Sequence, residues 1–246
     1  YFCSYTPEEI IYAAGVHPMR LFGTRAAIAH ADAHLQAYSC SLVRGVLEEA
    51  LAGRLEFLDG AVFPHTCDSI QRLSDIWRLN LDFSFHADVV LPVKLDTASA
   101  RKYMADVLRK FRSELEKGLG LSISDDDLAR SITTFNAIKR ALGTIYRLRS
   151  ENPGIISGGD VYALVKSAMI MDRSEAAEKL TAFADALSKE KASGSNARRR
   201  IVVSGGLCDH ADIYSIIEKS GGAVVWDDLC TGSRYFEGLV SEKGDP

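Results

Sequence analysis

Three of the five cysteines in the chain share one local setting. Cys40, Cys67 and Cys230 each follow an apolar or extended run, and each precedes a pattern that can start a helix. In an α/β protein such positions lie beyond the carboxyl ends of the strands, where open sheets bind their ligands. The positive end of a helix favours the thiolate, which is the form of cysteine that binds metal. Three such thiolates would suit one iron-sulfur cluster that keeps one iron open to a substrate.

The other two cysteines lie in different settings. Cys208 follows a predicted strand and is a better candidate for an added ligand than Cys3. If both contributed, five thiolates would suit a larger cluster. Any single cysteine is also compatible with a small buried hydrophobic residue. An odd, scattered set of cysteines indicates a reducing compartment rather than a disulfide framework, so we expect a cytoplasmic protein.

Composition and charge exclude several classes of partner. The chain has 246 residues, of which 47% are hydrophobic and 25% charged, and its formal net charge is -4. These values are typical of a globular protein and argue against a nucleic-acid or anionic-membrane partner. No apolar run approaches the roughly 18 residues of a membrane span, and no secretion signal is visible at the start. The first residue is not Met, so we expect a trimmed or processed start.

The elements that position the cysteines alternate between strand and helix at the beginning of the chain. Strands are predicted at 2–5, 61–63 and 88–93, with an extended segment at 16–22. A helix follows Thr6 as N-cap and Pro7 as first helical residue, and two more helices precede Gly53 and follow Cys67. This alternation predicts a mostly parallel sheet.

The middle of the chain is helical, and its end returns to the α/β pattern. Helices are predicted at 97–119, 124–150 and 158–190, with an interruption near Asp172. A polar linker at 191–196 precedes a strand at 200–204, a helix at 212–219 and a strand at 223–226. The predicted fold class is therefore α/β: a Rossmann-like parallel-sheet domain (1–95), a helical insertion (96–195) and the start of a second α/β domain (196–246). We expect that second domain to be cut short.

Several polar residues near the cysteines are candidates for catalysis. Ser39 and His65 stand beside two of the cysteines, as does Thr66, and they can hydrogen-bond a cluster or a substrate, or serve only in turns and caps. His17 is a possible acid or base, or a plain histidine in an extended segment.

Charged residues near the end of the chain admit simpler interpretations. Asp227 and Asp228 can tune a cluster, but capping of the following helix is the favoured interpretation. The basic run at 198–200 is better interpreted as a solvated edge than as a phosphate clamp.

Taken together, these segments carry a family resemblance. The chain resembles the catalytic subunits of 2-hydroxyacyl-CoA dehydratases and the cluster-bearing subunits of ATP-dependent benzoyl-CoA reductase. The matching stretches are residues 5–10 and 14–18, Tyr38-Ser39-Cys40 with Arg44, Thr66-Cys67-Asp68, and residues 227–236. The resemblance implies a [4Fe-4S] cluster held by Cys40, Cys67 and Cys230, with the fourth iron open to water, hydroxide or substrate. It also implies two α/β domains with added helices, in subunits longer than this chain.

The chemistry implied by the resemblance is removal of water from an (R)-2-hydroxyacyl-CoA. One electron would convert the thioester to a ketyl radical, which expels the 2-hydroxyl and makes the 3-proton acidic. The resemblance further implies a homologous second subunit and an ATP-dependent iron-sulfur activator, in the cytoplasm of an anaerobe. Three alternatives stay open: a benzoyl-CoA-reductase-type or double-cubane [8Fe-9S] reductase, a non-catalytic electron-relay or assembly subunit, and purely structural cysteines. The acyl group itself is not predicted.

Overall fold

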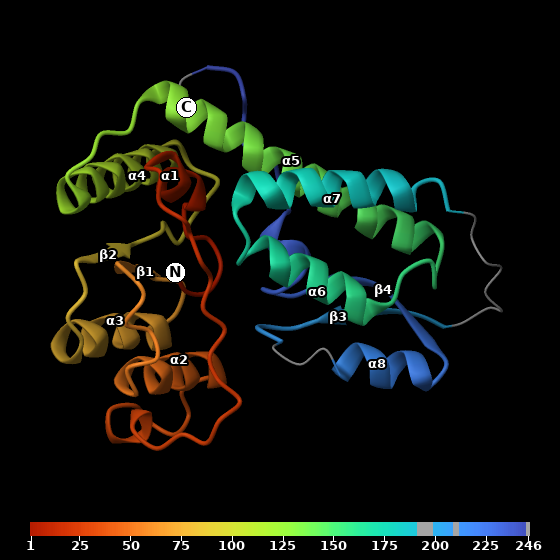
Figure 1. Cartoon of the computed structure of the whole chain (residues 1–246), viewed down its shortest axis with the longest axis horizontal. Helices are drawn as coiled ribbons and strands as arrows, with labels where there is room; N and C mark the ends of the chain where they lie inside the picture. Colours follow the sequence, from red (N-terminus) through yellow and green to blue (C-terminus); the bar gives the residue numbers. More distant parts are fainter. Residues whose placement is uncertain (191–198, 209–211, 245–246) are drawn as a thin grey trace. The chain divides into compact units, whose positions relative to one another are not determined.

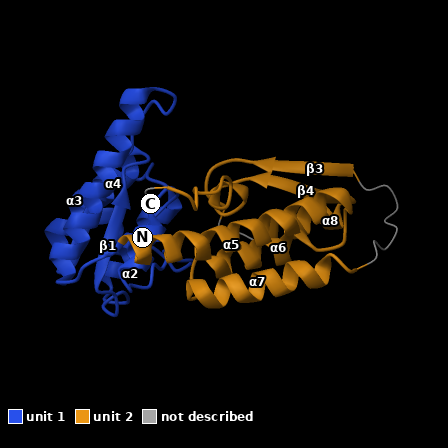
Figure 2. Cartoon of the chain, turned by 90° about the horizontal axis from the view of Figure 1, so that it is seen from above, with its two compact units in different colours: residues 1–124 blue, residues 125–246 orange. Residues whose placement is uncertain are grey.

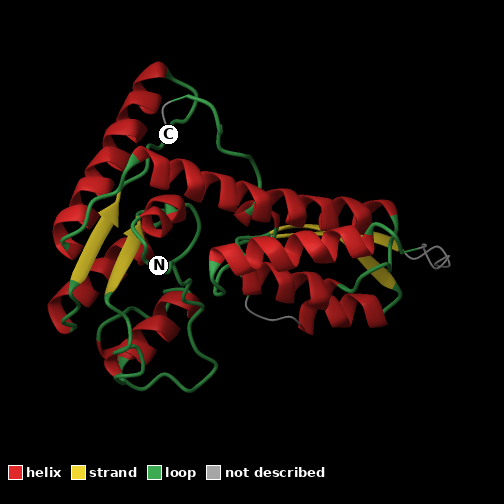
Figure 3. Cartoon of the chain, turned by 45° about the horizontal axis from the view of Figure 1, so that its top comes forward, coloured by secondary structure: helices red, strands yellow, loops and turns green. Residues whose placement is uncertain are grey.

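The chain folds into two compact units, each with its own parallel pair of strands. The computed structural model describes residues 1–190, 199–208 and 212–244, and its units are Tyr1–Ser124 and Asp125–Pro246 (Figures 1 and 2). Each unit contains a two-stranded sheet and several helices (Figure 3). The predicted α/β class is therefore confirmed, whereas the predicted linker at 191–196 lies outside the described residues.

The first unit alternates strands and helices. Its elements are α1 (Glu8–Ala13), η1 (Ala31–Ala33), α2 (Ser41–Leu51), β1 (Gly60–Pro64), α3 (Asp68–Asn80), β2 (Phe85–Val89) and α4 (Ala98–Leu119). Strands β1 and β2 pair in parallel, with Gly60 opposite Phe85 and Pro64 opposite Val89. The carboxyl ends of both strands thus lie at the same edge of the sheet.

An aromatic cluster fixes β1 against α3. The rings of Phe2 and Phe63 stack with centroids 4.4 Å apart, and Trp77 meets Phe63 edge-on at 5.7 Å. All three side chains are buried. Because large buried aromatic side chains dominate core energetics, this cluster holds the strand and the helix on either side of the short β1–α3 loop. That loop contains Cys67.

The predicted strand at 2–5 is wrong. Cys3 and Tyr5 have positive φ values of 52° and 71°, which no strand residue adopts. The predicted cap at Thr6 is also wrong, because the N-cap of α1 is Pro7. The Thr6 hydroxyl donates instead to the carbonyl of Phe2, so it stabilises the preceding turn.

The predicted strand at 88–93 is displaced by several residues. The observed β2 begins at Phe85 and ends at Val89, with Phe85, Ala87 and Val89 buried on one face. Val90 and Val93 are exposed. The alternating pattern at 85–89 therefore determines the strand, and the apolar run after it belongs to the following loop.

In the second unit three helices precede the pair of strands in sequence. Its elements are α5 (Asp125–Glu151), α6 (Gly158–Ala168), α7 (Arg173–Leu187), β3 (Arg199–Ser204), α8 (Asp212–Lys219), β4 (Gly222–Asp228) and η2 (Ser233–Tyr235). Strands β3 and β4 pair in parallel, with Arg199 opposite Gly222 and Ser204 opposite Asp228. The predicted break near Asp172 is confirmed, because its carboxylate caps α7 by accepting the N–H groups of Ser174 and Glu175.

The two units are defined by contacts between residues, whereas the three predicted ranges are defined by the type of secondary structure expected in each. The predicted range 1–95 falls within the first unit, and the predicted helical range 96–195 contributes α4 to the first unit and α5, α6 and α7 to the second. The three-part division stays a prediction. Within the described part of the chain, no helix combines the length and the apolar character needed to cross a membrane.

Candidate functional site

Cys40 and Cys67 precede two of the helices that the sequence predicts in the first unit. Cys40 is the N-cap of α2 and Cys67 is the N-cap of α3, both with extended backbone angles. Both residues are exposed, and neither side chain forms a capping hydrogen bond. Each thiol thus lies at the positive end of a helix of 11 or 13 residues, where a negative charge is stabilised.

The segment before Cys40 is organised by α2 itself. One carboxylate oxygen of Glu48 accepts the backbone N–H groups of Ala29, His30 and Ala31 at 3.0, 2.7 and 2.9 Å. These hydrogen bonds, chiefly that from Ala31, lower the pKa of Glu48 although its burial acts in the opposite direction. Residues 29–31 are therefore held by a helix that follows them in sequence.

Cys230 lies in the turn after β4. Its backbone N–H donates to the carbonyl of Gly206 at 3.1 Å, and the hydroxyl of Thr231 donates to the carbonyl of Cys208 at 2.8 Å. The turns after β3 and β4 are thus joined at one edge of the sheet. The predicted helix start at Cys230 is wrong, because η2 begins at Ser233 with Gly232 as its N-cap.

Arg234 joins the end of β4 to the sulfur of Cys230. Its Nε and Nη2 donate to the two oxygens of Asp228 at 2.6 and 2.8 Å, and its Nη1 lies 3.8 Å from the Cys230 Sγ. The hydroxyl of Ser204 donates to Asp228 as well, at 3.0 Å. The Arg234 and Ser204 hydrogen bonds lower the pKa of Asp228. The sequence patterns indicate no role for Arg234, which follows Cys230 by four residues as Arg44 follows Cys40.

The buried carboxylate of Asp227 stabilises the turn around Cys230. Asp227 is 1% exposed and accepts hydrogen bonds from the hydroxyl of Tyr146, at 3.0 and 2.9 Å, and from the backbone N–H of Ser233, at 3.1 Å. Arg149 Nη1 lies 3.5 Å from its Oδ2. Burial raises the pKa of Asp227, while Tyr146 and Arg149 oppose that rise. Asp227 thus binds the first backbone N–H of the short 3-10 helix η2, whose N-cap residue is Gly232.

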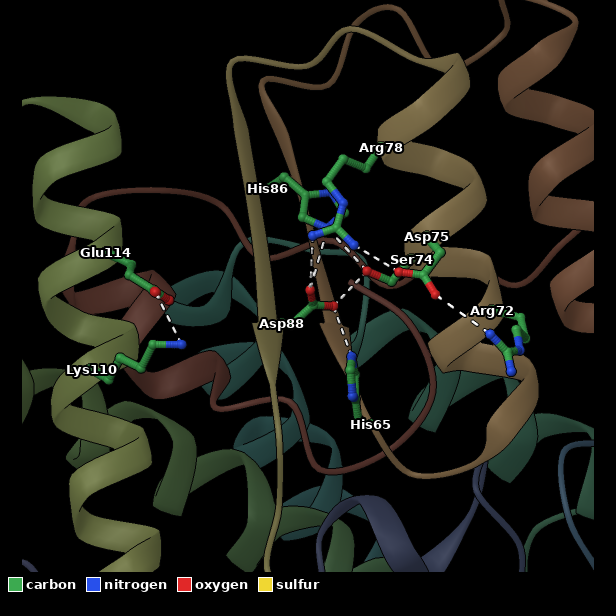
Figure 4. A network of polar contacts seen from close by, with 9 residues as sticks. All are labelled: His65, Arg72, Ser74, Asp75, Arg78, His86, Asp88, Lys110 and Glu114. Carbon is green, nitrogen blue, oxygen red and sulfur yellow. Dashed lines mark hydrogen bonds and ion pairs between the residues drawn. The ribbon is translucent and has the colours of Figure 1, made fainter.

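His65 belongs to a polar network at the carboxyl ends of β1 and β2 (Figure 4). Its Nε2 lies 2.8 Å from Asp88 Oδ1, and the hydroxyl of Ser74 donates to the same oxygen at 2.5 Å. His86 Nε2 lies 3.0 Å from the Ser74 hydroxyl, and Arg78 lies 3.8 Å from Asp88 Oδ2. Because an ionised carboxylate only accepts, Asp88 fixes the hydrogen on His65 Nε2.

The network also sets the protonation of its central carboxyl. Burial acts to raise the pKa of Asp88, but hydrogen bonds from His86, Ser74 and His65 hold that pKa well below its ordinary value. Sequence analysis placed Asp88 in a strand and gave it no part in the site. Its spacing of two from His86 on an alternating strand was a signal that the two side chains share a face.

The remaining predicted residues fall into different surroundings. Ser39 is buried in the turn before α2, where its N–H donates to the carbonyl of Gln36. Thr66 places a buried hydroxyl directly beside Cys67, and that oxygen has no hydrogen-bond partner among the described residues. His17 lines a mostly apolar cavity of about 230 Å³ at the amino ends of β1 and β2, opposite the end that leads to Cys67. Cys208 packs against the apolar cluster around Tyr214.

The chain matches the family model of the 2-hydroxyglutaryl-CoA dehydratase D-component over residues 3–246. It belongs to this family. A benzoyl-CoA reductase subunit of Thauera aromatica is 31% identical over 98% of the chain and 64% of its own length. The (R)-phenyllactyl-CoA dehydratase beta subunit of Clostridium sporogenes is 27% identical over the same shares. The (R)-2-hydroxyglutaryl-CoA dehydratase beta subunit of Acidaminococcus fermentans is 25% identical over 94% of the chain and 62% of its own length. The chain therefore spans just under two thirds of these relatives.

The structure of this family member brings some of the predicted residues together. His65, Thr66 and Cys67 share one loop of the first unit, and Cys40 starts a neighbouring helix of the same unit. Cys230 and Cys208 share one edge of the sheet in the second unit. No group of three metal-ligating side chains is formed within residues 1–190, 199–208 and 212–244. Convergence of the three cysteines on one cluster thus stays a prediction.

Substitution of Asp88 by Asn tests the first-unit network. A carboxyl whose pKa is lowered by folding stabilises the fold above its unfolded-state pKa, and this contribution is lost as pH falls through the lower folded-state pKa. We expect Asp88→Asn to cost about 1–3 kcal/mol near pH 5.5 and progressively less below about pH 4. Urea unfolding at the two pH values measures both costs. The control Asp75→Asn removes an exposed partner of Arg78 and should cost little at either pH; equal costs for the two variants would contradict the network.

Substitution of Gly232 by Ala tests the turn at Cys230. A Cβ at this position would lie 1.7 Å from Asp227 Oδ1, so the turn or the buried carboxylate must shift. We expect Gly232→Ala to lower the free energy of unfolding by about 1–3 kcal/mol, as for other overpacked sites. Gly206→Ala is the matched control, because a Cβ there meets no atom within 4 Å. Comparable unfolding midpoints in urea for both variants would show that Asp227 does not restrict this turn.

Proposed function

We propose that this chain is the iron-sulfur subunit of a 2-hydroxyacyl-CoA dehydratase, which removes water from an (R)-2-hydroxyacyl-CoA to give an enoyl-CoA. The observation that carries the proposal is the match to the dehydratase D-component over residues 3–246. Two of the relatives described above are named as dehydratase subunits. The substrate class is taken from those names, and the ketyl-radical route is part of the same proposal.

The cofactor proposed for this subunit is a [4Fe-4S] cluster on Cys40, Cys67 and Cys230. The chemistry of the donors fits, because none of these thiols is in a disulfide and thiolates are the usual ligands of such clusters. Two of them begin helices, whose positive ends suit a negatively charged group. The buried Thr66 hydroxyl offers a hydrogen-bond donor beside Cys67 that no described protein atom uses. A bound cluster would supply one electron and a Lewis-acidic iron.

The chain's own residues would orient substrate and move protons. Asp88 holds the hydrogen on His65 Nε2, so neutral His65 presents Nδ1 as a proton acceptor. Ser74 supports Asp88 from α3 and thereby fixes the carboxylate. We propose His65 as an acid or base for the substrate proton, and Ser39 as a polar group beside Cys40. This assignment uses the two catalytic candidates predicted from the sequence.

The proposed partners are inferred from the names of the relatives. All three are subunits of larger enzymes by name, so a partner subunit is expected here as well. We propose that this partner is a homologous subunit, that electrons arrive from an ATP-dependent iron-sulfur activator, and that the complex works in the cytoplasm. A benzoyl-CoA-reductase-type subunit is the second candidate, because the relative with 31% identity carries that name.

Iron content tests the ligand assignment. Cys40→Ala, Cys67→Ala and Cys230→Ala should each lose most of the iron bound by the anaerobically reconstituted chain, because each removes one of three protein ligands. Cys3→Ala and Cys208→Ala are the matched controls and should keep it. Iron and sulfide are measured per chain, together with the EPR spectrum after reduction. Retention of iron by all three variants would overturn the assignment, and about eight irons per chain would indicate the double-cubane alternative.

Electron accounting separates the dehydratase from the reductase. The assembled enzyme, with its partner subunit and a reductant, is given an (R)-2-hydroxyacyl-CoA. A dehydratase should form many molecules of enoyl-CoA for each electron supplied, because the electron returns after every turnover. A reductase would consume electrons in proportion to product. Stoichiometric consumption would therefore overturn the dehydratase proposal and favour the second candidate.

A further inference from the structure

Two nitrogens of the Arg234 guanidinium donate to a carboxylate, and the third contacts a sulfur. Nε and Nη2 are both used by the carboxylate of Asp228, and Nη1 is the nitrogen that lies 3.8 Å from Cys230 Sγ. A bidentate pair of this kind fixes the plane of the guanidinium as well as its position. The N–H directed at the sulfur is therefore set by the end of β4 and not by a flexible side chain.

The backbone that carries the sulfur is held in place as well. Asp228 is the last residue of β4, and it is held in place by Ser204, the last residue of β3. Cys230 is tied to the turn after β3 by its backbone hydrogen bond to Gly206. Donor and acceptor thus belong to one edge of the sheet, where hydrogen bonds hold both the carboxylate that orients Arg234 and the backbone of Cys230.

The surroundings of Cys40 provide a contrast within the same chain. Arg44 follows Cys40 by four residues, as Arg234 follows Cys230, and the two arginine side chains are 28% and 29% exposed. The guanidinium of Arg44, however, donates Nε and Nη2 to Asp32 Oδ1 at 3.0 and 2.6 Å. Although the spacing and the exposure are alike, Arg234 contacts the sulfur of Cys230, whereas Arg44 pairs with Asp32.

We propose that Arg234 is a positioning residue that raises the reduction potential of the cluster through its contact with the Cys230 sulfur. This inference rests on the proposed function, since it requires Cys230 to be a ligand. Hydrogen bonds to cluster sulfurs and nearby positive charge favour the more negative, reduced form, and therefore raise the potential. Arg234 supplies both at the sulfur of Cys230.

The experiment compares Arg234→Met with Arg44→Met in the anaerobically reconstituted chain. Iron per chain is measured first, and the midpoint potential is then determined by redox titration followed by EPR. We expect Arg234→Met to keep its iron but to lower the ratio of reduced to oxidised cluster about tenfold at a fixed solution potential, which is 59 mV for one electron. Arg44→Met should leave the ratio unchanged, and Arg234→Lys, which keeps the charge without the fork, should fall between.

The outcomes distinguish this inference from the proposed function. An unmodified chain that binds no iron overturns both. Iron bound equally by all variants with equal potentials overturns the role of Arg234 and leaves the cluster assignment standing. If Arg234→Met loses its iron, the test rests on the potential of Arg234→Lys. A lowered potential in Arg234→Lys supports the proposal. An unchanged potential, or loss of iron, in Arg234→Lys overturns it. An equal shift in Arg44→Met would show a general charge effect and would also overturn it.

Discussion

Parallel strand pairing is the constraint on which the candidate site depends. Two parallel strands bring the loops that follow them to one edge of their sheet, although those loops are separated by a helix in sequence. In the first unit this pairing places Asp88 beside the loop of His65 and Cys67, because Phe63 lies opposite Asp88 and Pro64 opposite Val89. In the second unit it joins the turn of Cys230 to that of Cys208. Each arrangement would be lost if its own pair of strands changed register.

The two units stabilise their cysteine turns by different means. In the first unit a helix begins at the cysteine, and the helix itself provides the favourable electrostatic setting. In the second unit the turn after Cys230 has only a short 3-10 helix, and two adjacent carboxylates organise it instead. Asp227 is directed inward to Tyr146 and Ser233, while Asp228 holds Arg234 at the surface. The alternation of successive side chains along β4 accounts for this division of roles.

Local patterns predicted much of the fold but not the contacts of the site. Helices with clear apolar periodicity and N-caps, such as α2, α3 and α4, lie where the sequence predicts them. The strand at 88–93 was misplaced because a short apolar run does not show where burial ends, and only pairing with β1 fixes β2 at Phe85–Val89. For the same reason the local sequence does not predict the role of Asp88. Its contact with His65 spans 23 residues and exists only once the strands pair. Arg234 was missed because spacing alone does not distinguish it from Arg44, and the difference lies in which carboxylate is within reach.

The hydrogen bonds of Glu48 have a consequence for how this part of the family can vary. A single side-chain oxygen on α2 receives three successive amides of the segment at 29–31. Asp32 in the next turn accepts from Arg44 of the same helix, so α2 holds residues 29–32 through its own side chains. Residues 34–38, between these contacts and Ser39, form neither helix nor strand, and loops of this kind accept insertions and deletions at little cost in free energy. During evolution this short loop is therefore free to change in length, whereas the spacing of eight between Cys40 and Glu48 is restricted by α2, which begins directly after Cys40 and carries Glu48.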